Sequence, residues 1–307
     1  MALDLKAKIY NDEAAARAHL ESIQWPDGPV CPHCGVVNEA TKLEGKSTRP
    51  GVYKCRPCQK PFSVTVGTVF ERSKIPLTKW LLATELLTSS KKGISAHQIH
   101  RMLGVTYKTA WFMMHRIREA MKPVGNAPLG GNGAVVEVDE TFIGTKTEVV
   151  RKKGPRGHWH KNTVLSLVER GGKVRSFYMP QLRSADMNDI LGRFVRPDTN
   201  LRTDEWVVYT APAKRFDSHE TVNHSQNEYV RGDASTNTVE GVFSIFKRGM
   251  IGTYQHCGQQ HLQRYLAEFD FRYSNREKLG VNDTMRAAKA LAGINGKRLT
   301  YRRTHEA

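Results

Sequence analysis

The sequence predicts an α/β core that contains a mixed β-sheet, preceded by two smaller N-terminal modules. Three observations predict this layout. Two Cys-x-x-Cys pairs occur near the N-terminus, helical periodicity covers residues 73–122, and β-type runs in hairpin order followed by alternating helix and strand patterns begin at residue 134. The chain has 307 residues, of which 39% are hydrophobic, so it can bury a core and is longer than a typical single domain.

Basic residues outnumber acidic residues along the whole chain. Lys and Arg total 47 against 30 Asp and Glu, a formal net charge of +17. The expected partner is therefore a polyanion, most simply nucleic acid, although ribosomal and membrane-surface proteins share a basic balance. The chain has no apolar run of the roughly 18 residues that a transmembrane helix needs and no apolar signal core at its N-terminus. We therefore expect a soluble, cytoplasmic protein with no membrane partner.

Four of the five cysteines predict a zinc site. They form two pairs with two residues inside each pair, Cys31 with Cys34 and Cys55 with Cys58. This spacing lets two tight turns direct four thiolates to one structural Zn²⁺, which then supplies folding energy to a short segment. Structural disulfides or a redox pair are the alternatives, but the sequence has neither a secretory signal nor a thioredoxin-like context. We expect His33 not to be a ligand and Cys257 to be an incidental thiol.

Residues 73–122 predict a helix-turn-helix region. Apolar residues at helical spacing predict its first helix, with Thr78 as the expected N-cap. Ser95 is expected to cap a short second helix, Gly104 to form the turn, and Thr106 to begin a third helix. A plain three-helix packing unit has a similar pattern, so DNA recognition is one of two readings of this region.

The third helix of this region offers side chains for both kinds of DNA contact. Its exposed N-terminal end is expected to meet base edges, and its later arginines are expected to meet phosphates. The candidates for base contact are Tyr107, Lys108 and Thr109, and the candidates for phosphate contact are Arg116 and Arg118.

Residues 123–133 are rich in Pro, Gly and Asn and have no periodicity, which predicts a linker. Beyond it, the patterns predict strands over 134–144, 163–170, 174–180 and 200–204 and around 219–225, with helices over 184–195, near 235, over 259–276 and over 282–293. Three strands in hairpin order followed by alternating helix and strand indicate a mixed sheet, as in ribonuclease-H-like folds. The chain ends in a basic tail.

Three acidic residues occupy positions that such a fold could bring together. Asp139 lies within the first strand, Asp204 ends the fourth, and Glu240 lies near the start of the following helix. In a ribonuclease-H-like sheet the first and fourth strands are neighbours, so the two aspartates would project side by side and a helix packed across them could offer Glu240. Such carboxylates repel one another unless divalent cations bind, and hard oxygen ligands suit Mg²⁺ or Mn²⁺. Two such ions about 4 Å apart would support phosphoryl transfer.

The polar neighbours of these acids have more ordinary interpretations. Glu137 shares the face of the first aspartate and is a candidate outer ligand, but we expect it to be a surface acid near the basic loop. Glu140 and Glu205 directly follow the aspartates and are expected to point elsewhere, and His224 is expected to be a packed or capping residue. Basic residues after the first strand and in the helix of the third acid are expected to line the path of the DNA. They are Lys146, Arg151, Lys152, Lys153 and Arg156 after the strand, and Lys247 and Arg248 in the helix.

Five blocks of the sequence carry a family resemblance. The blocks VEVDETFIGTK, RTDEWVVY, VNHSQNEYVRGD, TNTVEGVFSIFKRGMIGTY and HLQRYLAEFDFRYSNR resemble, in this order, insertion-sequence transposases of the ISXO-type group, which join an N-terminal zinc ribbon to a DDE catalytic domain. The resemblance implies a ribonuclease-H-like core with a Mg²⁺-dependent triad at Asp139, Asp204 and Glu240. It also implies recognition of terminal inverted repeats and strand transfer into target DNA. Because some relatives use Asn as the third residue, Asn237 is the alternative to Glu240.

The sequence therefore predicts a DNA transposase that acts on double-stranded DNA as a homo-oligomer and forms no covalent protein intermediate. The alternatives are a zinc-ribbon and helix-turn-helix regulator with an inactive catalytic domain, and a structure-specific nuclease that cuts but does not join. The expected segments are an N-terminal segment with zinc ribbon (1–72), a helix-turn-helix region (73–122), a linker (123–133), a DDE catalytic domain (134–277) and a C-terminal helix with a basic tail (278–307).

Overall fold

The computed structural model describes residues 4–125, 127–146, 160–222, 230–231 and 234–300. The chain separates into two compact units. The first comprises Met1–Ser90, Ile94–Lys122 and Val281–Ala307, and the second comprises Lys91–Gly93 and Pro123–Gly280. The C-terminal helix, predicted as part of a separate segment, therefore belongs to the same unit as the N-terminal helices.

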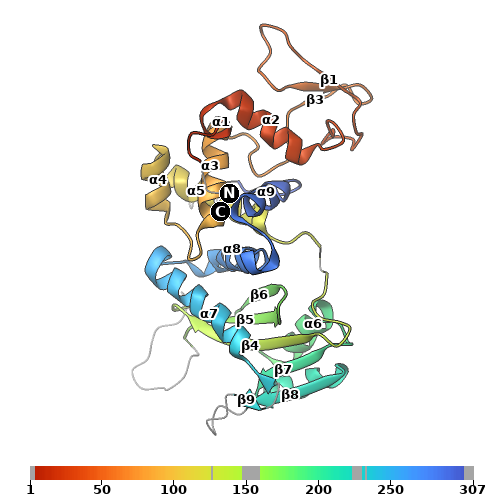
Figure 1. Ribbon diagram of the computed structural model, residues 1–307, viewed down its shortest axis with the longest axis vertical. Coiled ribbons are helices and arrows are strands. Elements are labelled where there is room, and N and C mark those ends of the chain that lie inside the picture. The colour runs from red at the N-terminus through yellow and green to blue at the C-terminus, as the bar shows by residue number, and fades with distance from the viewer. Residues whose placement is uncertain (1–3, 126, 147–159, 223–229, 232–233, 301–307) are drawn as a thin grey trace. The chain divides into compact units, whose positions relative to one another are not determined.

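The second unit contains a five-stranded mixed sheet with the strand order β6-β5-β4-β7-β8 (Figure 1). The strands are β4 (Val135–Ile143), β5 (Asn162–Glu169), β6 (Val174–Met179), β7 (Asn200–Asp204) and β8 (Ser218–Val222). Strands β4, β5 and β6 pair antiparallel, whereas β7 runs parallel to both β4 and β8. The predicted α/β class and mixed sheet are confirmed, and the first and fourth strands of the unit are neighbours as expected.

The two faces of this sheet are covered by different helices. On one face, Val136 and Val138 of β4 pack into a core with α6 (Ser184–Phe194). On the other face, Val164 and Val168 of β5 pack against α7 (Asn237–Gly249) and α8 (Leu262–Ser274). Because side chains alternate along a strand, the odd-numbered residues of β4 face the side of α7. The residues Glu137 and Asp139 therefore share the face that α7 covers.

Short elements connect these strands and helices. They are the 3₁₀ turns η1 (Val207–Tyr209), η2 (Pro212–Arg215), η5 (Gln259–His261) and η6 (Glu277–Leu279), the π turn η4 (Met250–Tyr254), and the paired strands β9 (Val230–Arg231) and β10 (Ala234–Ser235). Within the described residues, every helix is too short or too polar to cross a membrane.

Part of the predicted linker belongs to the second unit. Leu129 is 4% exposed, its N–H donates to the carbonyl of Phe194 at 2.8 Å, and its own carbonyl accepts from the N–H of Arg196 at 3.0 Å. Gly130 follows with a φ of 76°, which glycine adopts without strain. The predicted boundary at 133 is therefore too late, because a composition rich in Gly and Pro also describes a segment that turns tightly while it packs.

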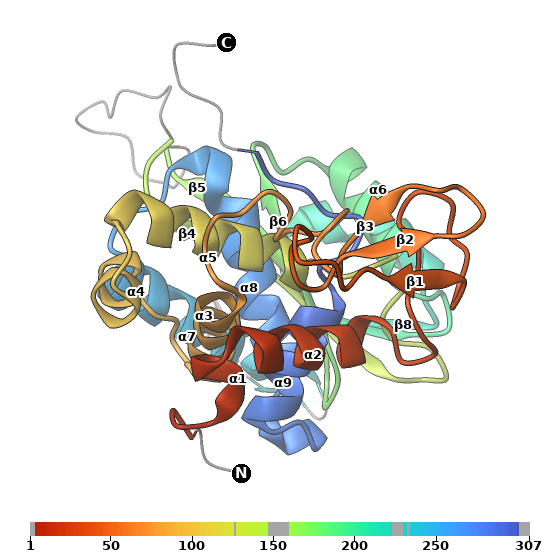
Figure 2. The same ribbon diagram turned by 90° about the horizontal axis from the view of Figure 1, so that it is seen from above.

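The first unit combines helices with a three-stranded antiparallel sheet. Strands β1 (Ala40–Lys42), β2 (Tyr53–Cys55) and β3 (Pro61–Phe62) pair in that order and lie together in Figure 2. The helices are α1 (Lys8–Asn11), α2 (Glu13–Gln24), α3 (Leu77–Ser89), α4 (Ala96–Leu103), α5 (Tyr107–Met121) and α9 (Asp283–Ala292). Helix α9 contacts α2, α3 and α5, so the two ends of the described chain build one helical core.

Capping residues set the boundaries of α4 and α5 as predicted. The Ser95 hydroxyl accepts from the N–H of Gln98 at 3.1 Å in a reciprocal capping box at the start of α4. Gly104 ends α4 with a left-handed φ of 58°. The Thr106 hydroxyl accepts from the N–H of Thr109 at 3.2 Å and so begins α5.

The start of α3 differs from the prediction. Thr78 lies inside the helix, and the N-cap position is Pro76, which makes no side-chain capping bond. The Glu13 carboxylate instead accepts from the N–H groups of Leu77 at 3.0 Å and Thr78 at 3.3 Å. The predicted N-cap is wrong because a carboxylate distant in sequence satisfies the first amides of the helix.

Candidate functional site

Three carboxyl groups meet where β4 and β7 run side by side. Glu137 of β4 pairs with Arg202 of β7 in parallel register, so Asp139 and Asp204 occupy equivalent positions two residues further along. Ligand oxygens of Asp139, Glu140 and Asp204 all lie within 4.8 Å of one another. The fold thus brings together the two aspartates that sequence patterns selected.

Burial and mutual repulsion govern the ionisation of this cluster. Burial raises the pKa of Asp139 to about 8, and the charges of Glu140, Asp204 and Glu240 add to the increase. The hydrogen bond from the N–H of Glu140 to Asp139 Oδ1, at 2.7 Å, opposes it. Burial likewise raises the pKa of Glu140 to about 7. A divalent cation between these groups would favour their ionised forms, and a set of carboxylate oxygens fits Mg²⁺ or Mn²⁺.

Glu140 was expected to point away from the aspartates, and this expectation is wrong. The Tyr209 hydroxyl donates to Glu140 Oε2 at 2.6 Å, and the Tyr209 ring is fully buried in the core on the α6 side. Strand alternation fixes only the direction of the Cα–Cβ bond, and the register of β7 with β4 ends at Glu137. Past the end of this pairing, the Glu140 carboxyl lies within 4.8 Å of those of Asp139 and Asp204. Sequence patterns gave no signal for Tyr209.

Helix α7 carries the third predicted acid and its alternative. Glu240 and Asn237 are exposed and lie one turn apart. The Thr236 hydroxyl donates to Glu240 Oε1 at 3.1 Å. Among the described residues, the group within 4.8 Å consists of Asp139, Glu140 and Asp204, and Glu240 is outside it, although its charge raises the pKa of Asp139. Both Glu240 and Asn237 therefore stay candidates for the third ligand.

Glu137 is a buried anchor and not the surface acid that was expected. Its side chain is 0% exposed. Its carboxylate accepts from the N–H groups of Thr238 at 2.8 Å and Val239 at 2.9 Å, and from Arg170 Nε at 2.6 Å. The strand pattern identified the face of Glu137 but could not identify helix amides about 100 residues later as its partners.

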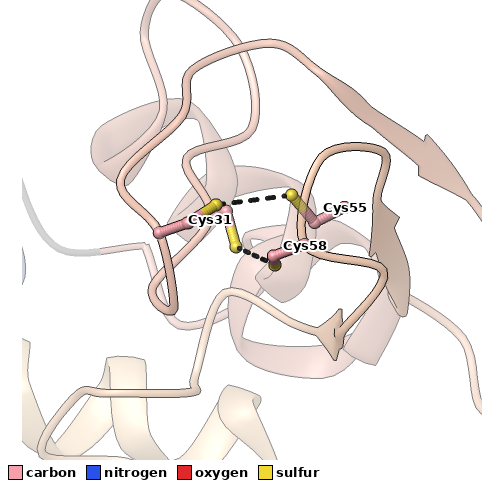
Figure 3. Close-up of side chains that lie close together, drawn as sticks. Cys31, Cys55 and Cys58 are labelled. Atoms are coloured by element: carbon pink, nitrogen blue, oxygen red, sulfur yellow. Dashed lines mark hydrogen bonds between the residues drawn. The ribbon is translucent and has the colours of Figure 1, made fainter.

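The four paired cysteines converge in the first unit. One ligand sulfur from each of Cys31, Cys34, Cys55 and Cys58 lies within 4.8 Å of all the others. The Sγ atoms of Cys31 and Cys58 are 3.7 Å apart, and those of Cys34 and Cys55 are 3.6 Å apart. Figure 3 shows the sulfurs of Cys31, Cys55 and Cys58 pointing toward one another. Zn–S bonds of about 2.3 Å in a tetrahedron separate sulfurs by about 3.8 Å, so this arrangement fits one structural Zn²⁺.

Two regions of the chain match known protein families. One region contains the carboxylate cluster, and the other contains the four paired cysteines. A family model described as the ISXO2-like transposase domain matches residues 128–274. A second, described as the transposase zinc-ribbon domain, matches residues 11–61. The two matches together give the arrangement predicted from the sequence, a transposase zinc ribbon followed by an ISXO2-like transposase domain. The resemblance inferred from sequence blocks is therefore confirmed, and these two matched domains contain the carboxylate cluster and the four cysteines.

A relative from Halobacterium salinarum extends the comparison across most of the chain. The chain is 27% identical over 285 residues to a protein of Halobacterium salinarum described as an uncharacterized protein in transposable element ISH50. The alignment covers 86% of this chain and 92% of the relative. The similarity therefore includes both units and is not limited to the region that matches the transposase domain.

Helix α5 presents its N-terminal residues to solvent. Tyr107 is 43% exposed, stacks on His97 with ring centroids 4.3 Å apart, and precedes the exposed Lys108. Thr109 is partly buried. These three candidates for base contact are therefore at an accessible helix end.

The two arginines predicted for phosphate contact have structural partners instead. Arg118 is 1% exposed, so the prediction that it meets phosphates is wrong. Arg116 is half-buried, and its guanidinium donates to the carbonyls of Leu299 and Glu71, both at 3.2 Å. Helical spacing did not separate the buried and exposed faces here, because long arginine side chains can bury their stems among apolar neighbours.

The structure describes some of the other basic residues predicted to contact DNA and leaves others outside its described part. Lys247 and Arg248 are exposed on α7, and Lys146 Nζ donates to the carbonyl of Pro180 at 2.9 Å. Several predicted residues lie outside the described part of the chain. They are Arg151, Lys152, Lys153 and Arg156 in the basic loop, and His224.

Proposed function

We propose that this transposase binds the terminal inverted repeats of an insertion sequence and catalyses metal-dependent DNA cleavage and strand transfer. The observation that carries the proposal is the meeting of the Asp139 and Asp204 carboxylates on adjacent parallel strands, in a chain of a transposase family. The strand order, with three antiparallel strands followed by two parallel ones, supports a ribonuclease-H-like core. The capped pair α4 and α5 supports a helix-turn-helix module.

The residues of the cluster would hold Mg²⁺ or Mn²⁺ through Asp139, Asp204 and either Glu240 or Asn237. When bound, two such ions activate an attacking oxygen and stabilise the leaving oxygen of a phosphodiester. The chain orients the ligands: the N–H of Trp206 donates to Asp204 Oδ1 at 3.1 Å, and the N–H of Glu140 donates to Asp139 Oδ1 at 2.7 Å. Water, and then the liberated 3′-hydroxyl, would be the nucleophiles, so no covalent protein intermediate forms.

The DNA would be bound by the first unit together with the basic surface of α7. The net charge of +17 supplies long-range attraction to double-stranded DNA, both the inverted repeats and the target. The family of the zinc-ribbon domain also supports a role in DNA binding. A homo-oligomer on DNA would allow the two ends of one element to be processed together.

The assay that tests this function uses labelled inverted-repeat DNA with Mg²⁺. Cutting followed by joining of the labelled strand is the expected result. Cutting without joining would indicate a structure-specific nuclease, and sequence-specific binding without cutting would indicate a regulator with an inactive catalytic domain.

The third ligand can be assigned by comparing Glu240→Gln with Asn237→Ala. Because the Glu240 charge acts on Asp139, we expect Glu240→Gln to lower cleavage by about 100-fold and Asn237→Ala to lower it much less. Cleavage of labelled DNA ends at a series of Mg²⁺ concentrations measures both effects. The opposite order of the two effects would assign the ligand to Asn237.

Base recognition by α5 can be tested with Lys108→Ala. We expect the ratio of specific to random DNA affinity to fall by about tenfold, because an exposed lysine at the start of a recognition helix contacts base edges. Fluorescence anisotropy with inverted-repeat and scrambled DNA measures the ratio. The matched control is Arg101→Ala, an exposed charge on α4 that should weaken both affinities alike. Equal behaviour of the two variants would show that α5 does not read bases.

A further inference from the structure

Glu137 is a fully buried carboxylate that the proposed chemistry does not use. It lies in β4, two residues before Asp139 and on the same face of the strand, yet it is 0% exposed. A buried ionised carboxylate is costly unless hydrogen bonds and an opposite charge compensate it. Hydrogen bonds from Arg170, Thr238 and Val239 compensate the buried carboxylate of Glu137, which indicates that this residue has a structural role.

The carboxylate of Glu137 binds the first turn of α7. Oε2 accepts from the N–H of Thr238 at 2.8 Å and of Val239 at 2.9 Å, and Oε1 accepts from the Thr238 hydroxyl at 2.8 Å. The N-cap residue Thr236 makes no capping bond with its side chain. Glu137 therefore satisfies the amides that a cap would otherwise satisfy, and its negative charge lies at the positive end of the helix dipole.

Arg170, which directly follows β5, links Glu137 to Ser235. Its Nε donates to Glu137 Oε1 at 2.6 Å, while its Nη2 donates to the carbonyl of Ser235 at 3.1 Å and to the Ser235 hydroxyl at 2.9 Å. We call Glu137, Arg170, Ser235, Thr238 and Val239 the Glu137 clamp. The clamp joins β4, the end of β5 and the segment that leads into α7.

We infer that the Glu137 clamp positions the start of α7, and with it Glu240 and Asn237, against Asp139. This inference rests on the proposed function. Strand β4 supplies the first aspartate and, two residues earlier, the group that holds the helix carrying the third ligand. The carboxylate therefore fixes two parts of one metal site relative to the same strand. Glu137 is a positioning residue, because it acts through the helix that it holds.

Apolar packing keeps α7 docked independently of the clamp. Val239, Val242, Phe243 and Phe246 of α7 belong to the core on this face of the sheet. Loss of the clamp should therefore leave the helix in place but loosen its first turn. The expected consequence is weaker metal binding at temperatures where the protein is fully folded.

The test compares Glu137→Gln with wild-type protein. The amide keeps one oxygen that can accept from the Thr238 and Val239 N–H groups, but its NH2 group cannot accept the bonds that Arg170 Nε and the Thr238 hydroxyl donate to Oε1 in the wild type. Direct Mn²⁺ binding, measured without DNA by electron paramagnetic resonance, should weaken by about 10- to 100-fold. Hydrogen exchange should be faster in peptides that contain residues 236–243. Glu137→Ala should enhance both effects, and the Gln variant keeps the test valid if the Ala variant does not fold.

A matched control separates positioning from a general loss of stability. Asp270 of α8 is a partly buried carboxylate that accepts from the N–H of Ser176 at 2.6 Å and from its hydroxyl at 2.7 Å, so it also joins a helix to the sheet. Asp270→Ala removes both acceptors of this link, so it should lower thermal stability and leave Mn²⁺ affinity unchanged. Unchanged Mn²⁺ affinity in Glu137→Gln, or an equal loss in Asp270→Ala, would overturn the inference. If wild-type protein binds no Mn²⁺, the proposed function itself fails. Unchanged hydrogen exchange at residues 236–243 in Glu137→Gln would overturn the role of the Glu137 clamp separately.

Discussion

Replacing Asp139 or Asp204 by Asn is expected to abolish DNA cleavage while DNA binding persists. Each change preserves side-chain size but removes a charged ligand from the cluster in which the carboxylates lie within 4.8 Å of one another. Metal ions supply several kcal/mol of transition-state stabilisation in such reactions, so we expect the rate to fall by about 1,000-fold or more. Cleavage of a labelled inverted-repeat end in Mg²⁺ and in Mn²⁺, measured beside DNA affinity, tests this expectation. Near-normal cutting by either variant would refute the assignment.

The Asp139→Asn substitution should also stabilise the metal-free protein, and the size of this stabilisation should depend on pH. Burial raises the pKa of Asp139 from its usual 3.8 to about 8 in the folded state. The folded state therefore retains a proton that the unfolded state loses, so this group costs increasing stability as the pH rises from about 4 to about 8. Asp139→Asn removes that cost. Thermal melting without divalent cations should show a larger gain at pH 8 than at pH 5.

The control for these variants is Asp198→Asn in the same unit. Asp198 lies in the bend before β7 with its side chain 41% exposed, and it accepts from the N–H of Asn132 at 2.7 Å. Its pKa is lowered mainly by that backbone hydrogen bond, so removal of its charge should reduce stability and leave cleavage intact. A loss of cleavage in this control would show that the assay reports unfolding of the unit.

The neighbouring positions of Asp139 and Asp204 could be predicted because they depend on local patterns and a topology rule. Hydrophobic runs located β4 and β7, and the order of elements predicted that the two strands are adjacent. The register then carries the aspartates to equivalent positions. Their roles in catalysis remain a prediction.

The partners of Glu137 and Glu140 could not be predicted, because they depend on contacts between distant parts of the chain. The strand period gives the face of Glu137, but whether that face is solvent or the end of a helix depends on where α7 docks. The position of Glu140 depends in the same way on the buried hydroxyl of Tyr209. Arg118 shows a related limit: its charge suggested an exposed site, whereas packing within the helical unit buries it.

The ribbon has too small a core to remain folded without its metal. Its cluster of buried residues consists of Cys31, Cys55 and Phe62, supported by partly buried neighbours such as Trp25 and Tyr53. Two of the three fully buried members are the metal-binding cysteines themselves. Structural zinc contributes about 10 kcal/mol or more in modules of this kind, more than so few apolar contacts provide.

Cys31→Ser or Cys55→Ser is therefore expected to release the zinc and unfold the ribbon locally. Purified wild-type protein should contain one zinc ion per chain by elemental analysis, and either variant should contain almost none. Limited proteolysis should then cut between Cys31 and Cys58, while the unit with the mixed sheet stays resistant, because its apolar cores share no residues with the ribbon. Affinity for inverted-repeat DNA should fall at the same time. The matched control is Cys257→Ser, which removes the thiol outside the four-cysteine group and should retain the zinc. Wild-type protein without zinc, or a full zinc content in Cys31→Ser, would contradict a four-cysteine site.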